Sequence, residues 1–291
     1  MRRGAGAFGV RRLAAAFSVE GGGKPPHSKG HRIRYTRCTM TEMKKYPPGD
    51  FCWTELATSD GNAAKKFYSS LFGWKANEMP MGPDQPPYIM MQINGKNVCA
   101  MYENKKAPTK WSSYVSVANV DESAKKAKSL GGKLKTEPFD VMDVGRMANV
   151  VDPQGAVFAI WQPKRHIGAE LINEPNTMCW NELMTNDIES ARKFYSALFG
   201  WKLKISPQYT EAAVGDINTA GMMQMDERMR GVPPYWAPYF AVTDADGITK
   251  KAKSAGAKVH VEPTDIPEVG RFSVFSDPQG AMFSVIKLMA R

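Results

Sequence analysis

The sequence predicts an α+β protein assembled from four strand–helix–three-strand modules, two in each half of the chain. The first observation is a repeated segment: residues 60–75 return as residues 187–202, with eleven of sixteen positions identical at an offset of 127. The second is the turn Asp-Pro-Gln-Gly-Ala, which occurs at 152–156 and again, unchanged, at 277–281. Repeats of this kind indicate a duplicated architecture, so both halves should share one fold.

The repeated segment is typical of an amphipathic helix that packs on a sheet. Asp60 and Asp187 stand where a short carboxylate caps the first turn of a helix. Gly73 and Gly200 stand where a left-handed residue ends one. Apolar residues recur at helical spacing along one face, and we expect that face to be buried against the sheet. In the first copy this stripe consists of Ala64, Phe67, Tyr68 and Leu71.

The other elements follow from alternating apolar residues and from turn signals. In the first module, strands are expected at 51–58, 74–77, 88–93 and 97–102. The second, fainter module is expected to contain strands at 114–118, 133–136, 146–151 and 157–161 and a short helix at 121–130. The second half repeats this programme, with strands opening at 179–183 and 239–242 and a second short helix at 248–255.

Charge and composition divide the chain into four parts: a leader at 1–45, a first domain at 46–164, a linker at 165–176 and a second domain at 177–289. The chain carries a net charge of +10, but residues 1–45 hold eleven Lys or Arg and two acids. The remainder is therefore nearly neutral, and we expect no nucleic-acid surface. No apolar run approaches the roughly 18 residues that a membrane span needs, so no membrane partner is expected either.

The leader has the character of a targeting signal. Arg2, Arg3, Arg11 and Arg12 alternate with apolar residues, and no acid precedes Glu20. An Arg-rich, acid-poor amphipathic segment is typical of an organellar transit peptide, which predicts a mitochondrial protein. A disordered tail on a cytoplasmic protein is the alternative.

Two motifs together resemble a known superfamily. Asp-x-x-x-Ala-x-x-Phe-Tyr-x-x-Leu-Phe-Gly-Trp, followed by Asp-Pro-x-Gly-x-x-Phe, is similar to the glyoxalase, bleomycin-resistance and extradiol-dioxygenase superfamily, also called vicinal oxygen chelate. The resemblance covers roughly residues 50–289 and is strongest to tandem two-domain members such as actinobacterial antigens and hydroxylase-like proteins. It implies two glyoxalase-like domains, each made of two βαβββ modules that curl into a cupped mixed sheet around a small ligand.

The resemblance also implies where a divalent metal would bind. The superfamily takes one ligand from the first strand and one from the last strand of each module. None of the matching positions holds His, Glu, Gln or Asp, the side chains that such an ion requires. We therefore expect no metal or other cofactor, with a divalent metal at a displaced position as the alternative. The positions are Trp53, Trp180, Ser112, Ala237, Ala159 and Ser284, with Ala100 or Met101 and Gly221 or Met222.

Two carboxylates stand beside the first of these positions. Strand alternation places Glu55 on the same face as Trp53, and Glu182 on the same face as Trp180. A carboxylate next to an indole in a partly closed cavity is a candidate hydrogen-bond acceptor or general base.

Two arginines recur at equivalent places, Arg146 and Arg271. Each could bind the ligand or could pair with the glutamate of its own half. Aromatic and Met side chains, Tyr88, Tyr114 and Tyr239 among them, are expected to line an apolar site.

Three functions remain open from the sequence. The first is a protein that binds a small aromatic or amphipathic organic molecule without a metal. The second is an enzyme of the superfamily, either a lyase or isomerase of the glyoxalase type or a hydroxylase-like protein, that uses Glu55 or Glu182 or a metal at a displaced site. The third is a structural module whose cups are filled by side chains. The oligomeric state is left open between monomer and homodimer.

Overall fold

The computed structural model describes residues 41–289. The predicted leader therefore lies outside the described residues, except for its last five positions. Of these, Thr41–Glu42 form strand β1, which pairs antiparallel with β10 (Leu171–Ile172) in the predicted linker. Within the described residues, every helix is too short or too polar to cross a bilayer.

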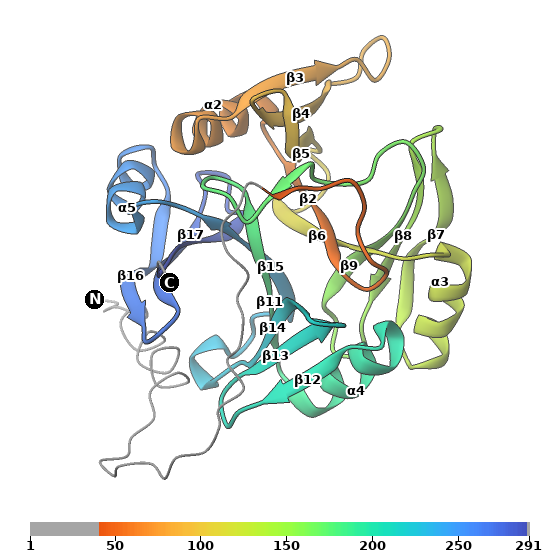
Figure 1. Ribbon diagram of the computed structural model, residues 1–291. Coiled ribbons are helices and arrows are strands. Elements are labelled where there is room, and N and C mark those ends of the chain that lie inside the picture. Colours follow the sequence, from red (N-terminus) through yellow and green to blue (C-terminus); the bar gives the residue numbers. More distant parts are fainter. Residues whose placement is uncertain (1–40, 290–291) are drawn as a thin grey trace, which may run out of the picture.

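Two eight-stranded mixed sheets form the body of the protein, one in each half (Figure 1). In domain 1 the strand order is β3-β4-β5-β2-β6-β9-β8-β7, and in domain 2 it is β12-β13-β14-β11-β15-β18-β17-β16. The first strands of the two modules, β2 and β6, pair antiparallel, while each pairs parallel with the last strand of its own module. This order confirms the two predicted modules in each half.

The elements of domain 1 are β2 (Phe51–Thr58), α2 (Gly61–Phe72), β3 (Lys75–Met79), β4 (Tyr88–Ile93), β5 (Lys96–Glu103), β6 (Lys110–Ser116), α3 (Val120–Ser129), β7 (Lys133–Val141), β8 (Gly145–Val151) and β9 (Val157–Pro163). Those of domain 2 are β11 (Met178–Thr185), α4 (Ile188–Phe199), β12 (Lys202–Ile205), β13 (Thr210–Val214), β14 (Ile217–Gln224), the short 3-10 helix η1 (Glu227–Met229), β15 (Tyr235–Ala241), α5 (Ala245–Ser254), β16 (Lys258–Ile266), β17 (Gly270–Ser276) and β18 (Met282–Leu288).

The predicted helix ends are confirmed. The Asp60 side chain accepts from the amide of Ala63, and Gly73 ends α2 with φ 73°. Asp187 and Gly200 do the same for α4. These left-handed glycines terminate the helices because other residues rarely adopt a positive φ.

The helices lie along the junction of the two domains, where one face of each is buried and the opposite face is exposed to solvent. Figure 1 shows α2 beside α5 and α3 beside α4, with the central strands β6 and β15 crossing between them. One continuous core contains the apolar stripes of α2 and α4 together with residues from both sheets. The face of each sheet that points away from this core, here called the cup face, carries a smaller apolar cluster of its own.

Each domain supplies a hydrogen bond that the other needs. The Tyr68 hydroxyl on α2 donates to the buried carboxylate of Asp277 at 2.9 Å, in the Asp-Pro-Gln-Gly turn of domain 2. The Tyr195 hydroxyl on α4 donates to Asp152 of domain 1 at the same distance. Trp111 and Trp236 donate in turn to these two hydroxyls, at 2.9 and 2.8 Å. The two halves are therefore held in one fixed arrangement.

Removing these hydroxyls should destabilise the whole protein. In Tyr68→Phe the buried Asp277 loses its donor from the opposite domain, and we expect a loss of about 1–3 kcal/mol in the free energy of unfolding. Tyr195→Phe should cost a similar amount, because it removes the equivalent donor from Asp152. Urea unfolding followed by tryptophan fluorescence measures both. An unchanged midpoint in both variants would show that the hydroxyls do not hold the domains together.

Candidate ligand-binding site

The cup face of domain 1 gathers the residues that the sequence singles out. Trp53 and Glu55 lie on this face of the central strand β2. Glu55 stands opposite Ala100 of β5 on one side and Ser112 of β6 on the other. Ala159 belongs to the same cluster, whereas Met101 points into the core between the domains.

The carboxylate of Glu55 is held by two phenols. Tyr88 on β4 donates to one oxygen at 2.5 Å, and Tyr114 on β6 donates to the other at 3.0 Å. The Trp53 indole in turn interacts with the Tyr88 hydroxyl. Three neighbouring strands thus build one set of side chains around Glu55.

Domain 2 repeats this set residue for residue. Tyr209 and Tyr239 donate to the two oxygens of Glu182 at 2.9 and 2.7 Å. The Trp180 indole donates to the Tyr209 hydroxyl at 3.0 Å. We call each group a Trp–Tyr–Glu–Tyr set. The set is therefore repeated together with the fold, once in each cup.

Burial without a cation dominates the electrostatics of both sets. It raises the pKa of Glu55 and of Glu182, and the phenol hydrogen bonds only partly oppose this. The phenols are affected in the same direction: burial and the nearby carboxylate raise the pKa of Tyr114 and of Tyr239 well above the usual value. These tyrosines therefore act as donors at neutral pH.

The two arginines are not part of these sets, so the predicted pairing of each with the glutamate of its own half is wrong. The Arg146 guanidinium donates to Asp121 at 2.8 and 2.9 Å and lies 3.6 Å from Asp140. Arg271 makes the equivalent contacts with Asp246 and Asp265. Both fasten the start of the second helix of a domain to the edge of its sheet, where solvent also reaches them.

The cup faces do not offer a donor set that suits a divalent metal. Each contains one carboxylate whose two oxygens accept from phenols, and the neighbouring positions are indole, methyl or hydroxyl groups. Across residues 41–289, no three His, Cys, Asp or Glu side chains converge as they would to hold a metal ion. The described residues of the cup faces thus present a single carboxylate each, and not the several converging donors that the superfamily's ion requires.

The linker covers one end of the cup face in domain 1. His166 packs edge-on against Trp53, with ring centroids 4.7 Å apart, and its backbone oxygen accepts from Trp161. Burial lowers the pKa of His166 to about 4, so the ring is neutral there. The backbone amide of Ala169 donates a hydrogen bond to the backbone oxygen of Cys52 at 2.7 Å. The segment expected to be only a linker therefore also covers part of the cup face in domain 1.

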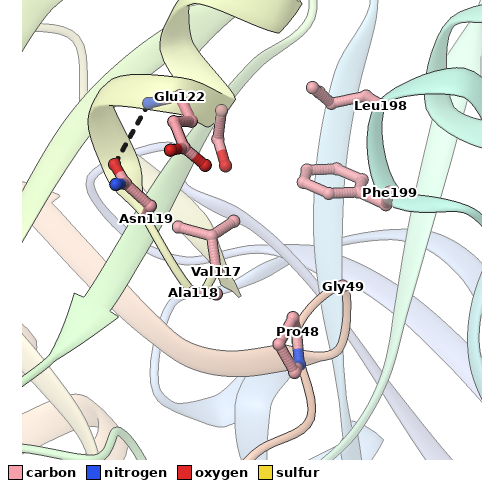
Figure 2. A pocket seen from close by; sticks show the side chains of 9 residues that line it. Pro48, Gly49, Val117, Ala118, Asn119, Glu122, Leu198 and Phe199 are labelled. Atoms are coloured by element: carbon pink, nitrogen blue, oxygen red, sulfur yellow. Dashed lines mark hydrogen bonds between the residues drawn. The ribbon is translucent and has the colours of Figure 1, made fainter.

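Two hollows lie away from the buried glutamates. A cavity of about 170 Å³ sits at the domain interface, where Val117 and Asn119 at the start of α3 face Leu198 and Phe199 of α4 (Figure 2). A second, of about 50 Å³, lies beside Trp180 at the start of β11. Neither is lined by Glu55 or Glu182.

Sequence reasoning missed one member of the sets, Tyr209. Its counterpart Tyr88 lies 121 positions earlier, whereas the repeated helices are 127 apart. The loop between the first two hairpin strands is shorter in domain 2, and the loop before β15 is longer. A signal does exist, since both tyrosines follow a Pro by two positions, at Pro86 and Pro207.

Comparison with known proteins agrees with this geometry. Residues 51–160 and 166–285 each match the Glyoxalase/Bleomycin resistance protein/Dioxygenase superfamily. The chain belongs to this superfamily. CFP32 of Mycobacterium tuberculosis, provisionally named a glyoxylase, is 42% identical over 85% of this chain and 98% of its own length. The anthracycline biosynthesis protein DnrV of Streptomyces peucetius is 33% identical over 84% of this chain and 96% of its own.

Solved structures of the superfamily share the fold. A Mn(II)-bound glyoxalase from Novosphingobium aromaticivorans superposes with a TM-score of 0.57 at 14% identity, covering 82% of each chain. The 2,3-dioxygenase LapB from Pseudomonas sp. KL28 gives 0.56 at 12% identity, over 86% of this chain and 93% of its own. The tandem glyoxalase-like arrangement expected from the sequence is therefore confirmed.

Domain 2 should not tolerate a side chain at Gly221. A Cβ there would lie 1.7 Å from the Tyr209 hydroxyl oxygen, so Gly221→Ala must displace that tyrosine. We expect a loss of about 1–3 kcal/mol in the free energy of unfolding, as for other overpacked sites. The reciprocal change Ala100→Gly in domain 1 creates no clash and is the matched control, expected to cost no more than about 1 kcal/mol. Equal losses in the two variants would contradict this packing.

The buried glutamates should make stability fall as the pH rises. Because the folded-state pKa of Glu182 lies above its usual value of 4.5, the folded protein binds the proton more tightly than the unfolded chain. Its contribution is thus largest at low pH and is lost above the usual pKa. Glu182→Gln should therefore gain stability relative to the parent as the pH rises above the usual pKa of 4.5.

Urea unfolding at several pH values measures this difference. Glu137→Gln, at an exposed position of β7, is the control and should track the parent protein. A difference between parent and Glu182→Gln that stays constant with pH would show that the carboxyl has the same pKa in both states.

Proposed function

We propose that this protein binds a small aromatic or amphipathic organic molecule at the cup face of a domain without using a metal. The observation that carries the proposal is the Trp–Tyr–Glu–Tyr set. A carboxylate is buried in an apolar cup, it is satisfied only by phenols, and it recurs at the equivalent place in both domains. Buried ionisable groups with strongly shifted pKa values concentrate at functional sites.

The surroundings of the set suit an organic ligand. Small-molecule sites are mostly apolar and carry a few polar groups that fix orientation. Met90, Met147 and Trp161 supply the apolar part in domain 1. The chain's relative DnrV is named for anthracycline biosynthesis, which concerns polycyclic aromatic compounds. Aromatic rings are the natural partners of such a lining.

A metal-free lyase or isomerase of the glyoxalase type is the second candidate. The raised pKa of Glu55 favours it, because a carboxyl that titrates closer to neutrality is a better general base. The relative CFP32 carries a glyoxylase name. In this case Glu55 would take a proton from the bound molecule, and the phenol of Tyr88 or Tyr114 would donate to the developing charge.

Mass spectrometry of small molecules that co-purify with the full chain tests the proposal. We expect a ring-containing compound in a ratio close to one per chain, and its loss from Ser112→Phe, which fills the cup beside Glu55. Lys66→Ala, at an exposed position of α2, is the control and should retain the compound.

Three other outcomes are informative. Zinc, nickel, iron or manganese retained stoichiometrically through dialysis would overturn the metal-free part of the proposal. Turnover of the bound compound that is lost in Glu55→Gln while binding persists would establish the enzyme instead. A parent protein that holds no compound, and binds none from an aromatic fragment collection, would indicate a structural module with filled cups.

A further inference from the structure

The two Trp–Tyr–Glu–Tyr sets differ in how far water reaches them. In domain 2 the three hydrogen-bonded residues are closed off: Glu182 and Tyr209 are each 6% exposed and Tyr239 is 4% exposed. In domain 1 Glu55 lies just as deep among its neighbours, but Glu55 and Tyr88 both remain partly exposed. The carboxylate of domain 1 is therefore the one that a molecule from solvent can approach, although in domain 2 the Trp180 indole is itself partly exposed.

One residue accounts for part of this difference. Tyr209 lies directly over Gly221, in space that a methyl group would occupy. The equivalent residue in domain 1 is Ala100, which stands opposite Glu55 on β5 just as Gly221 stands opposite Glu182 on β14. Because Ala100 carries that methyl group, Tyr88 cannot pack as close to the sheet as Tyr209 does, and the carboxylate beneath it is less covered.

Within the described residues, the reachable carboxylate also lacks a positive partner. Its contacts are the phenols of Tyr88 and Tyr114, and no cation contributes to its electrostatics. Arg146 is engaged by aspartates at the edge of the sheet. Lys110 begins the strand that carries Tyr114, but the charge that influences it is that of Lys135. A buried carboxylate without a cation costs free energy unless a positive charge pairs with it.

Aromatic rings lie close to this anion, and two of them, Tyr88 and Tyr102, are partly exposed. Tyr102 on β5 is partly exposed, and the Glu55 charge contributes to raising its pKa to about 12. With Tyr88 and Tyr114 it places three rings around one carboxylate. Ring faces attract organic cations, and aromatic cages are a recurrent means of recognising amines. A neutral molecule would gain the ring contacts but would leave the charge uncompensated.

We propose that the cup of domain 1 takes the amine-bearing, positively charged end of the ligand between Glu55 and the rings of Tyr88, Tyr102 and Tyr114, and that the closed set of domain 2 supports the fold. This inference rests on the proposed binding function and specifies the chemical class of the ligand and the domain that holds it. Binding of a cation replaces an uncompensated buried charge with an ion pair, so the charge of the ligand is the variable to test.

Three probes with one ring system separate charge from shape. Naphthylmethylamine, naphthylmethanol and naphthoate, all of the same positional isomer, are titrated calorimetrically into the full chain at neutral pH. We expect the amine to bind at least about tenfold more tightly than the alcohol and the naphthoate not to bind, in line with the strength of desolvated cation–ring and ion-pair contacts.

The same substitution in the two domains locates the site. Glu55→Gln should weaken amine binding by at least about tenfold and should leave the alcohol nearly unaffected. Glu182→Gln is the discriminating arm, and it should shift amine affinity less than about twofold. Lys110→Met should leave amine binding equal or tighter, because it removes a positive charge from the same strand. Circular dichroism and urea midpoints verify that each variant is folded.

The outcomes distinguish this inference from the function on which it rests. Equal affinity for amine and alcohol, or a loss that follows Glu182 instead of Glu55, would overturn the cationic ligand or its placement while preserving aromatic binding. Failure of all three probes to bind the folded parent protein would overturn the aromatic binding function and this inference with it.

Discussion

The architecture depends on an exchange of hydrogen bonds across the domain interface. The main helix of each domain carries a tyrosine that donates to a buried aspartate in the last turn of the other domain, Tyr68 to Asp277 and Tyr195 to Asp152. Each contact needs both halves, because the helix stripe and the turn are buried in a core that neither domain completes alone. The cups face away from this core, so their shape is fixed by an interface on the opposite side of each sheet.

The buried aspartates and the buried glutamates differ in the groups that donate hydrogen bonds to them. One oxygen of Asp152 accepts from the backbone amides of Gln154 and Ala156, while the other accepts from Tyr195. Amide donors of a tight turn cannot leave without unfolding it, so this carboxylate is structural. The oxygens of Glu55 accept only from side chains, which can turn aside for a ligand. A functional role is therefore more plausible for the glutamates than for the aspartates.

The sequence was sufficient for the features that depend on local order. Helix caps, the strand–helix–three-strand programme and the shared face of Trp53 and Glu55 follow from spacing, because periodicity determines which side chains point the same way. The apolar stripe of α2 was expected to pack on a sheet, and in the structure it also belongs to a core shared with the other domain. A stripe reveals that a face is buried and does not reveal what covers it.

The partners of Glu55 and Glu182 could not be predicted for a related reason. Which side chains meet across a sheet depends on strand register, and register depends on the lengths of intervening loops. The loops of the two halves differ in compensating ways, which hid the equivalence of Tyr88 and Tyr209. The partners of the two arginines could not be predicted either, because a recurring charge identifies a repeated contact without identifying its partner. In the structure that partner is an aspartate at the start of the neighbouring helix.

The two cups show how one set of residues can serve two purposes after small local changes. In domain 1 the linker packs on Trp53 and covers that end of the cup face. A molecule that binds beside Glu55 therefore contacts side chains that are already held in place. In domain 2 the corresponding end beside Trp180 lacks such a cover within the described residues, but Tyr209 seals the carboxylate over Gly221. Preorganisation lowers the cost of binding only where the anchoring group remains reachable. Binding is therefore favoured where the cup face is covered at one end and its carboxylate remains partly exposed. Domain 1 has both features.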